Sequence, residues 1–224
     1  EAGVQAVRPL LTEGIPVNVT LLFGLARYAE VLEAHLAAME ARAAAGERPN
    51  VASVASFFLS RIDVAIDPML DALADQSSDL AARAERLKGR VAVDNAKLAY
   101  AHWQNVMQSD RWAALAKAGT HPQRLLWAST GTKNPAYSPV MYVEPLIGEE
   151  TVNTMPTGTL DAYRDMGDPA SRIGEGVEDA RQRLGELAAL GIDLDEVTAT
   201  LEAEGVAKFV TPFDDLMKTL AEAV

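Results

Sequence analysis

The sequence contains no cysteine, and this absence removes several kinds of chemistry at once. Without thiols the chain has no disulfide framework, no thiolate zinc site and no cysteine nucleophile. It also lacks a long uncharged apolar run, which argues against a membrane-spanning helix. Its first residues, EAGVQAVRPLL, do not show the basic-then-apolar pattern of a secretory signal peptide. We therefore expect a cytoplasmic protein.

Positive charge is scarce as well. Lys and Arg number 20 against 32 Asp and Glu, so the formal net charge is -12 at pH 7. A surface that acidic repels nucleic-acid phosphates, and we expect no nucleic-acid partner. An anionic substrate would need its own local group of cations. His35, His102 and His121 have no evident catalytic partner in the sequence, so we interpret them as structural.

The chain is long enough for one large domain. It has no repeat, low-complexity stretch or long linker, and we predict a single domain over residues 1–224. Apolar spacing alternates between the strand period of two and the helix period of 3.6. The strand-like segments are residues 15–23, 51–58, 124–128 and 150–154.

Helical spacing fills most of the remaining chain. The predicted helices cover residues 1–13, 25–39, 68 onward, 80–108, 111–117 and 175 onward. We expect Asp67 to cap the third helix, with Pro68 at its first position, and Ser78 to cap the fourth. Gly191 and Gly205 are expected to interrupt the last one.

Strands that alternate with helices favour an α/β fold with parallel pairing and crossover helices. Buried parallel strands are usually apolar throughout, but these carry Asn18, Thr20, Ser56 and Ser129 toward their carboxyl ends. In a (β/α)₈ TIM barrel the active site lies at that end of the strands. The pattern therefore favours barrel strands with a polar mouth.

Four segments, in order, resemble the transaldolase family. EGIPVNVTLL (13–22), SVASFFLSRI (53–62) and LWASTGTKNP (126–135) resemble its fifth, sixth and seventh strands. VEPLIGEETVNTMPTGTLDAY (143–163) resembles the eighth strand and its surroundings. The resemblance covers essentially the whole chain. It implies a (β/α)₈ TIM barrel of which this chain forms about the second half, strands 5 to 8, plus C-terminal helices.

The resemblance also implies an activity. Transaldolases of the pentose phosphate pathway move a dihydroxyacetone unit from a ketose phosphate, sedoheptulose 7-phosphate or fructose 6-phosphate, to an aldose phosphate. The intermediate is a Schiff base on a lysine, which turns the substrate carbon chain into an electron sink. We accordingly expect sugar-phosphate substrates, no cofactor, no metal and no membrane partner.

Site residues follow from the matching positions. The resemblance assigns substrate hydroxyls to Asn18 and Ser56, the pocket wall to Phe58, and the catalytic water to Thr20. Without the resemblance, Asn18 and Thr20 would be a polar pair with backbone partners inside a sheet. Asn18-Val19-Thr20 also matches the N-glycosylation sequon, a short pattern with many false positives, and we expect no glycan there.

The phosphate end rests on three residues. Arg61 would bind the phosphate bidentately, and Ser129 would lie beside it. Some transaldolases have an arginine where this chain has Gly131, and Lys133 is the replacement cation that the sequence offers. Taken alone, Arg61 would be a surface ion-pair residue and Lys133 a solvated loop lysine.

The Schiff-base lysine is the main departure from the family. In transaldolases it lies on the fourth strand, just before the helix that residues 1–13 resemble, and no lysine precedes Asn18. The resemblance implies that an upstream half of the barrel, in the same polypeptide or a companion chain, supplies it, and that the isolated chain is inactive. Two alternatives remain open: a transaldolase domain in a fused sugar-phosphate enzyme, and a non-catalytic half-barrel for sugar-phosphate binding or assembly.

Overall fold

The computed structural model describes residues 2–222. Four strands form one sheet in the order β1-β2-β3-β4, and every neighbouring pair is parallel. The strands are β1 (Val17–Leu22), β2 (Ser53–Phe58), β3 (Arg124–Ala128) and β4 (Thr151–Asn153). The predicted α/β class with a parallel sheet is confirmed, and the predicted strands overlap the observed ones.

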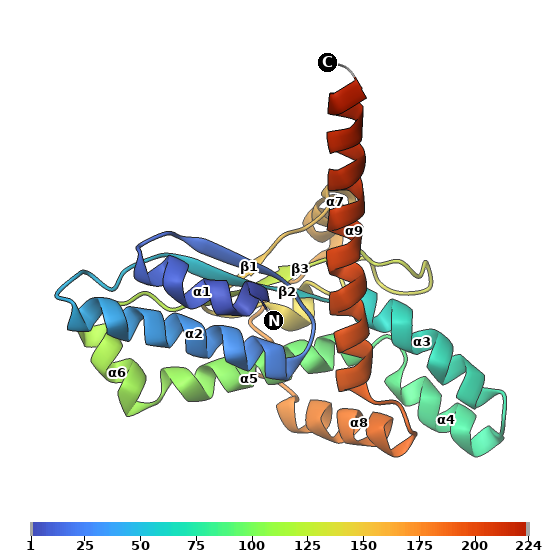
Figure 1. The fold of residues 1–224 in the computed structure, drawn as a ribbon. Helices are drawn as coiled ribbons and strands as arrows, with labels where there is room; N and C mark the ends of the chain where they lie inside the picture. Colours follow the sequence, from blue (N-terminus) through green and yellow to red (C-terminus); the bar gives the residue numbers. More distant parts are fainter. Residues whose placement is uncertain (1, 223–224) are drawn as a thin grey trace.

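Helices connect the strands and extend beyond them (Figure 1). They are α1 (Ala2–Thr12), α2 (Leu25–Ala44), α3 (Ser60–Ala74), α4 (Ser78–Leu87), α5 (Val91–Met107), α6 (Asp110–Lys117), the short 3₁₀ helix η1 (Glu144–Leu146), α7 (Thr157–Met166), α8 (Val177–Ala189) and α9 (Leu194–Glu222). Within residues 2–222, no helix combines the length and the apolar character that crossing a membrane requires.

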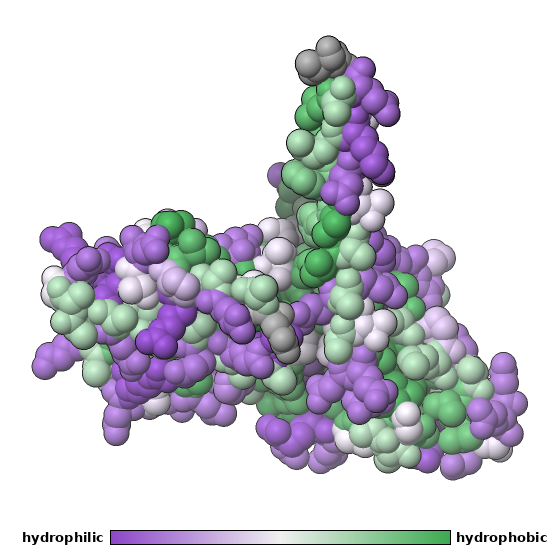
Figure 2. Space-filling view, in the orientation of Figure 1, coloured by the Kyte–Doolittle hydropathy of each residue, from purple (hydrophilic) through white to green (hydrophobic). Residues whose placement is uncertain are grey.

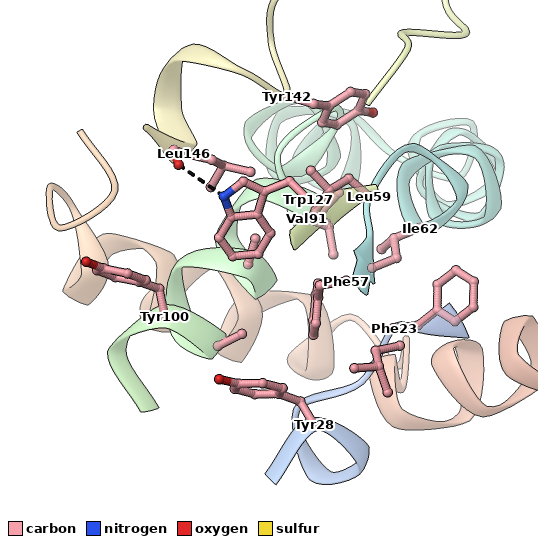
Figure 3. Packing of buried hydrophobic residues seen from close by; sticks show 14 of the residues in the cluster. Phe23, Tyr28, Phe57, Leu59, Ile62, Val91, Tyr100, Trp127, Tyr142 and Leu146 are labelled. Carbon is pink, nitrogen blue, oxygen red and sulfur yellow. Dashed lines mark hydrogen bonds between the residues drawn. The ribbon is translucent and has the colours of Figure 1, made fainter. Parts of the chain in front are cut away.

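The core lies between one face of the sheet and the helices. Phe57 of β2 is paired in register with Trp127 of β3, and both side chains are buried. The Phe57 ring meets Trp127 and Tyr28 edge-on, with centroids 6.2 Å apart in each pair, and lies between them (Figure 3). The Trp127 indole Nε1 donates to the Leu146 carbonyl at 3.1 Å. Trp127 is therefore a packing residue and faces away from the polar side of the sheet.

The opposite face carries the polar side chains that the sequence singled out. Asn18 and Thr20 are exposed, and Ser56 lies on the same face as Asn18. The alternation of β1 breaks at Leu21, whose φ of 61° lies in the left-handed region. Leu21 and Leu22 are consequently both buried, whereas strict alternation would expose one of them.

The predicted start of the third helix is wrong. Helix α3 begins at Ser60 and runs through Pro68 to Ala74. Proline removes one helical hydrogen bond, to the carbonyl of Val64. Val64 is 54% exposed, so water can solvate that carbonyl. Asp67 does not cap a helix: its Oδ1 accepts a hydrogen bond from the Gly89 amide at 3.0 Å.

The predicted helix 80–108 is two helices, α4 and α5. Gly89, with a φ of 64°, lies between them in a conformation that favours glycine. The N-cap of α4 is Ser77 and not Ser78, because the Ser77 Oγ accepts the Leu80 amide at 3.2 Å. Helix α7 was not predicted.

Gly205 does not interrupt the last helix. Helix α9 continues through it. A Cβ at this position would lie 3.0 Å from Leu21 Cδ2, so glycine allows the helix to pack closely against Leu21. The C-terminal part of α9 rises away from the rest of the molecule (Figure 1). Apolar side chains follow it outward, with spacings of three and four residues (Figure 2). This α9 stripe consists of Val206, Phe209, Val210, Phe213, Leu216, Met217 and Leu220, which are 49–64% exposed.

Candidate active site

The first group of predicted site residues lies on the polar face of β1 and β2. The Ser56 Oγ donates to Asn18 Oδ1 at 2.7 Å, and Ser56 is buried while Asn18 is exposed. This bond fixes the orientation of the Asn18 amide and leaves its Nδ2 as a donor on the open face. Asn18 and Thr20 line a groove of about 350 Å³ between α1, β1 and α9.

Arg61 lies in the first turn of α3, directly after β2. Its guanidinium carbon lies 5.3 Å from the centroid of the Phe58 ring, a cation–π arrangement that orients the cation. Phe58 is held in turn by Phe23, at a centroid distance of 5.5 Å. Phe58 therefore shapes this end of the sheet by positioning Arg61.

Ser129 follows β3 and has a φ of 55°, which is uncommon for a residue with a side chain. Its Oγ lies 2.8 Å from the Ser60 Oγ, and its carbonyl accepts the Ser60 amide at 3.0 Å. Left-handed residues outside glycine often occur where a backbone is held for function. Ser60 was missed in the sequence analysis; its position one residue before Arg61, at the end of a strand, was the available signal.

Arg61 and Lys133 line one cleft of about 730 Å³, together with Ser60 and residues of α3 and α9. Among the described residues, neither cation forms a salt bridge with a carboxylate. The interpretation of Arg61 as a surface ion-pair residue is therefore wrong. Lys208 of α9 also lines the cleft but pairs with Glu204 at 3.3 Å.

Gly131 lies beside Pro156, and this contact explains the absence of a larger residue. A Cβ at position 131 would lie 3.1 Å from Pro156 Cγ, closer than most Cβ contacts. A side chain there would require the proline ring to shift by a few tenths of an ångström. Lys133, two residues later, is exposed on the loop after β3 and reaches the cleft without that constraint.

Helix α9 lies between the two groups of site residues. It contributes Glu202 and Val206 to the groove beside Asn18, and Leu201 and Glu204 to the cleft beside Arg61. The groove and the cleft share no lining residue. The structure thus brings together Asn18 with Ser56, and Arg61 with Lys133, but not all of them in one cavity. Glu196 and Glu204, two glutamates of the acidic N-terminal part of α9, form part of the cleft wall.

Six lysines are available as candidates for the Schiff-base nucleophile. They are Lys88, Lys97, Lys117, Lys133, Lys208 and Lys218, and none of them lies on a strand. Burial lowers the pKa of Lys97, a property that favours nucleophilic amines. However, Lys97 belongs to α5, and its Nζ donates to the carbonyls of Glu175 at 2.6 Å and Arg172 at 3.4 Å. Its contacts are those of a residue that holds the segment before α8.

His35 and His102 fit the structural interpretation. His35 is buried on α2, and its Nε2 lies 3.3 Å from the His121 carbonyl. The His102 ring meets Tyr28 edge-on at a centroid distance of 6.1 Å. No group of three or more His, Asp or Glu side chains in the part of the chain that the structure describes is arranged to hold a metal ion.

Comparisons with known proteins match the chain to transaldolases. The profile of the Transaldolase/Fructose-6-phosphate aldolase family matches residues 1–220. A transaldolase of Trichodesmium erythraeum (strain IMS101) is 47% identical over 227 residues, which cover 99% of this chain and 60% of that protein. Transaldolase 2 of Nostoc sp. (strain PCC 7120) is 47% identical, with coverages of 98% and 59%. Transaldolase 1 of Streptomyces avermitilis is 46% identical, with coverages of 100% and 58%.

The chain thus spans about three fifths of the length of these curated relatives. This share does not support the expectation that it corresponds to their C-terminal half. The identity extends over nearly the whole of the present chain, and the profile match leaves only its last four residues uncovered. The chain belongs to the Transaldolase/Fructose-6-phosphate aldolase family.

Proposed function

We propose that this chain is the substrate-binding part of a transaldolase, which transfers a dihydroxyacetone unit from a ketose phosphate to an aldose phosphate. The observation that carries the proposal is the cleft lined by Arg61 and Lys133, neither of which forms a salt bridge within residues 2–222. Two such cations at the carboxyl ends of parallel strands suit a phosphate group, and the relatives are named transaldolases.

The remaining site residues receive roles that agree with their contacts. Asn18, oriented by Ser56, binds hydroxyls of the dihydroxyacetone unit through its free Nδ2. Thr20 lies two residues further along the same open face and positions the catalytic water. Phe58 forms the wall beside Arg61. Ser129, 2.8 Å from Ser60, borders the phosphate end.

The Schiff-base lysine of this proposal lies outside the 224 residues. Support comes from the described strands, none of which carries a lysine, and from Lys97 of α5, whose amine donates to backbone carbonyls of the segment before α8. We propose that the chain carries strands 5 to 8 of a (β/α)₈ barrel and that the remaining part of the longer protein supplies the nucleophile.

That remaining part would cover the surface around β1. In the described sheet β1 is an edge strand, and the groove beside it is lined mainly by apolar residues of α1, β1 and α9. The α9 stripe begins at Val206, which lines the same groove. Apolar surface of this extent requires a partner. About two fifths of the relative's length lies outside the match to this chain, and the corresponding part of the longer protein would provide that partner.

Borohydride trapping tests the activity. The full-length protein that contains these residues is incubated with fructose 6-phosphate and borohydride, and the adduct is located by peptide mapping. We expect one adduct on a lysine outside residues 1–224. An adduct on Lys97 or another of the six lysines would overturn the placement of the nucleophile.

The same experiment addresses the alternative of a non-catalytic half-barrel, which the lysine-free strands keep open. Absence of any adduct, together with absence of three-carbon transfer to an aldose phosphate, would favour that alternative. A nucleophile introduced by a companion chain would appear as an adduct on that chain after the two are mixed.

A further inference from the structure

The loop that carries Lys133 has few connections to the rest of the fold. It runs from Ser129 to η1 without a strand or long helix. Its ends are fixed, because Thr130 Oγ1 donates to the Thr154 carbonyl at 3.0 Å and the Tyr142 carbonyl accepts Asn153 Nδ2 at 3.1 Å.

One hydrogen bond joins the middle of the loop to another element of the described chain. The Tyr137 Oη donates to Asp67 Oδ2 of α3 at 2.8 Å. The other hydrogen bonds of residues 131–139 stay within the loop; among them, Thr132 Oγ1 donates to the Ser138 carbonyl at 2.9 Å, and the Tyr137 amide donates to the Asn134 carbonyl at 3.1 Å. These internal bonds close the segment 132–138 on itself. Any displacement of Tyr137 is therefore transmitted to Lys133.

Asp67 is itself fixed by a second partner. Its Oδ1 accepts the Gly89 amide at 3.0 Å, so the carboxylate joins α3, the α4–α5 junction and the loop. The Tyr137 ring lies directly on Gly89, where a Cβ would come within 2.8 Å of Tyr137 Cζ. Both the hydroxyl and the ring of Tyr137 are thus confined.

A parallel contact one turn earlier reinforces this arrangement. Asp63, four residues before Asp67 on α3, accepts the Tyr142 hydroxyl at 2.8 Å and the Ala92 amide at 2.9 Å. Arg61 precedes Asp63 by two residues. Helix α3 therefore carries one cation of the cleft directly and, through its aspartates, holds the loop that carries the other.

We propose that Tyr137 and Asp67 are positioning residues for phosphate binding, because their hydrogen bond sets the place of Lys133 relative to Arg61. This inference rests on the proposed function. Without the bond, the loop can move, and Asp67 Oδ2 becomes available to Lys133, which also lines the acidic pocket formed by Asp63, Asp67 and Asp71. Either effect draws the ammonium away from the cleft.

Binding of inorganic phosphate to the full-length protein, measured by calorimetry, tests the proposal without requiring turnover. We expect Lys133→Ala to raise the Kd about tenfold and Tyr137→Phe to raise it about threefold to tenfold. Tyr100→Phe is the matched control, since it removes a hydroxyl bond of 3.1 Å to the Glu149 carbonyl elsewhere in the fold. It should change the Kd less than twofold. Asp67→Ala, which removes the acceptor of the Tyr137 hydroxyl, should also raise the Kd.

The double variant Lys133→Ala/Tyr137→Phe separates positioning from general destabilisation. If Tyr137 acts through Lys133, its effect on the Kd disappears when the lysine is absent. Additive effects in the double variant, or an unchanged Kd in Tyr137→Phe while Lys133→Ala weakens binding, would overturn the inference alone. An unchanged Kd in Lys133→Ala would overturn it together with the phosphate role of the cleft. Three-carbon transfer is measured in the same preparations, so phosphate binding without transfer would overturn the proposed function and leave this inference standing.

Discussion

Two buried titratable groups are predicted to give the protein opposing pH dependences of stability. Burial raises the pKa of Asp63 from 3.8 to about 7, against the opposing effects of the Ala92 amide and the Tyr142 hydroxyl; the charges of Asp67 and Asp94 raise it further. Burial lowers the pKa of His35 from 6.5 to about 4, with partial opposition from its hydrogen bond to the His121 carbonyl.

The signs follow from proton linkage. Asp63 binds its proton more tightly in the folded state, so its contribution to stability is complete below pH 3.8 and is lost as the pH rises to 7. The shift corresponds to about 4 kcal/mol. His35 is held neutral in the folded state, so its contribution is complete above pH 6.5 and is lost as the pH falls to 4, by about 3 kcal/mol. The two contributions nearly cancel in the wild type.

Single substitutions should reveal each contribution. The unfolding free energy of Asp63→Asn minus that of wild type should rise by about 4 kcal/mol as the pH increases from 4 to 7. The same difference for His35→Gln should fall by about 3 kcal/mol as the pH increases from 4 to 6.5. Urea unfolding at several pH values, followed by tryptophan fluorescence, measures these differences, and comparison with wild type cancels the other titrating groups. A flat difference curve for Asp63→Asn would refute the reasoning, since it would mean that the hydrogen bonds to Asp63 offset its burial completely.

Further predictions concern the groove and helix α9. Ser56→Ala removes the 2.7 Å bond that orients Asn18, and steady-state kinetics of the full-length protein should show kcat/KM for the donor sugar lowered about tenfold; an unchanged value would contradict the role of that bond. Gly205→Ala should destabilise the protein by about 1 to 3 kcal/mol in urea unfolding, because its Cβ meets Leu21 at 3.0 Å. The matched Gly185→Ala on α8, with nothing within 4 Å, should stabilise it by about 0.5 to 1 kcal/mol, and equal effects of the two changes would count against the packing argument.

Elements with a clear apolar period could be predicted from the sequence. Strand β3 is observed at its predicted residues 124–128, and the buried face of α2 contains Tyr28, Leu32, Leu36 and Met39, as its spacing indicates. Both patterns are local consequences of burying one face of an element. They require no knowledge of the partner element.

Local sequence signals were misleading where the structure depends on contacts with distant residues. Pro68 is typical of a helix start, but packing of α3 against its neighbours extends the helix through it. Gly205 is typical of a helix end, but it serves close contact with Leu21, 184 residues earlier in the sequence. The hydrogen bond between Tyr137 and Asp67 joins residues that are 70 positions apart in the sequence, and no local pattern predicts it.

The candidate site was predictable in its residues and not in its arrangement. Strand-end polar residues and the resemblance to transaldolases indicated Asn18, Ser56 and Arg61, and the structure joins the first two by a direct hydrogen bond. Helix α9 separates the groove from the cleft, although it begins more than 130 residues after Arg61. Its position depends on packing of Gly205 against Leu21 and on the 3.0 Å ion pair of Arg27 with Glu202. Periodicity within α9 could not indicate that position.

The central claim, that the cleft of Arg61 and Lys133 receives the phosphate of a sugar substrate, is tested most directly by comparing donors with and without a phosphate. For Arg61→Ala in the full-length protein, we expect kcat/KM for fructose 6-phosphate to fall about 10- to 100-fold, the effect of losing charge-assisted bonds, while the value for fructose stays within about twofold. Equal losses for both sugars, or no loss for the phosphorylated one, would contradict the account.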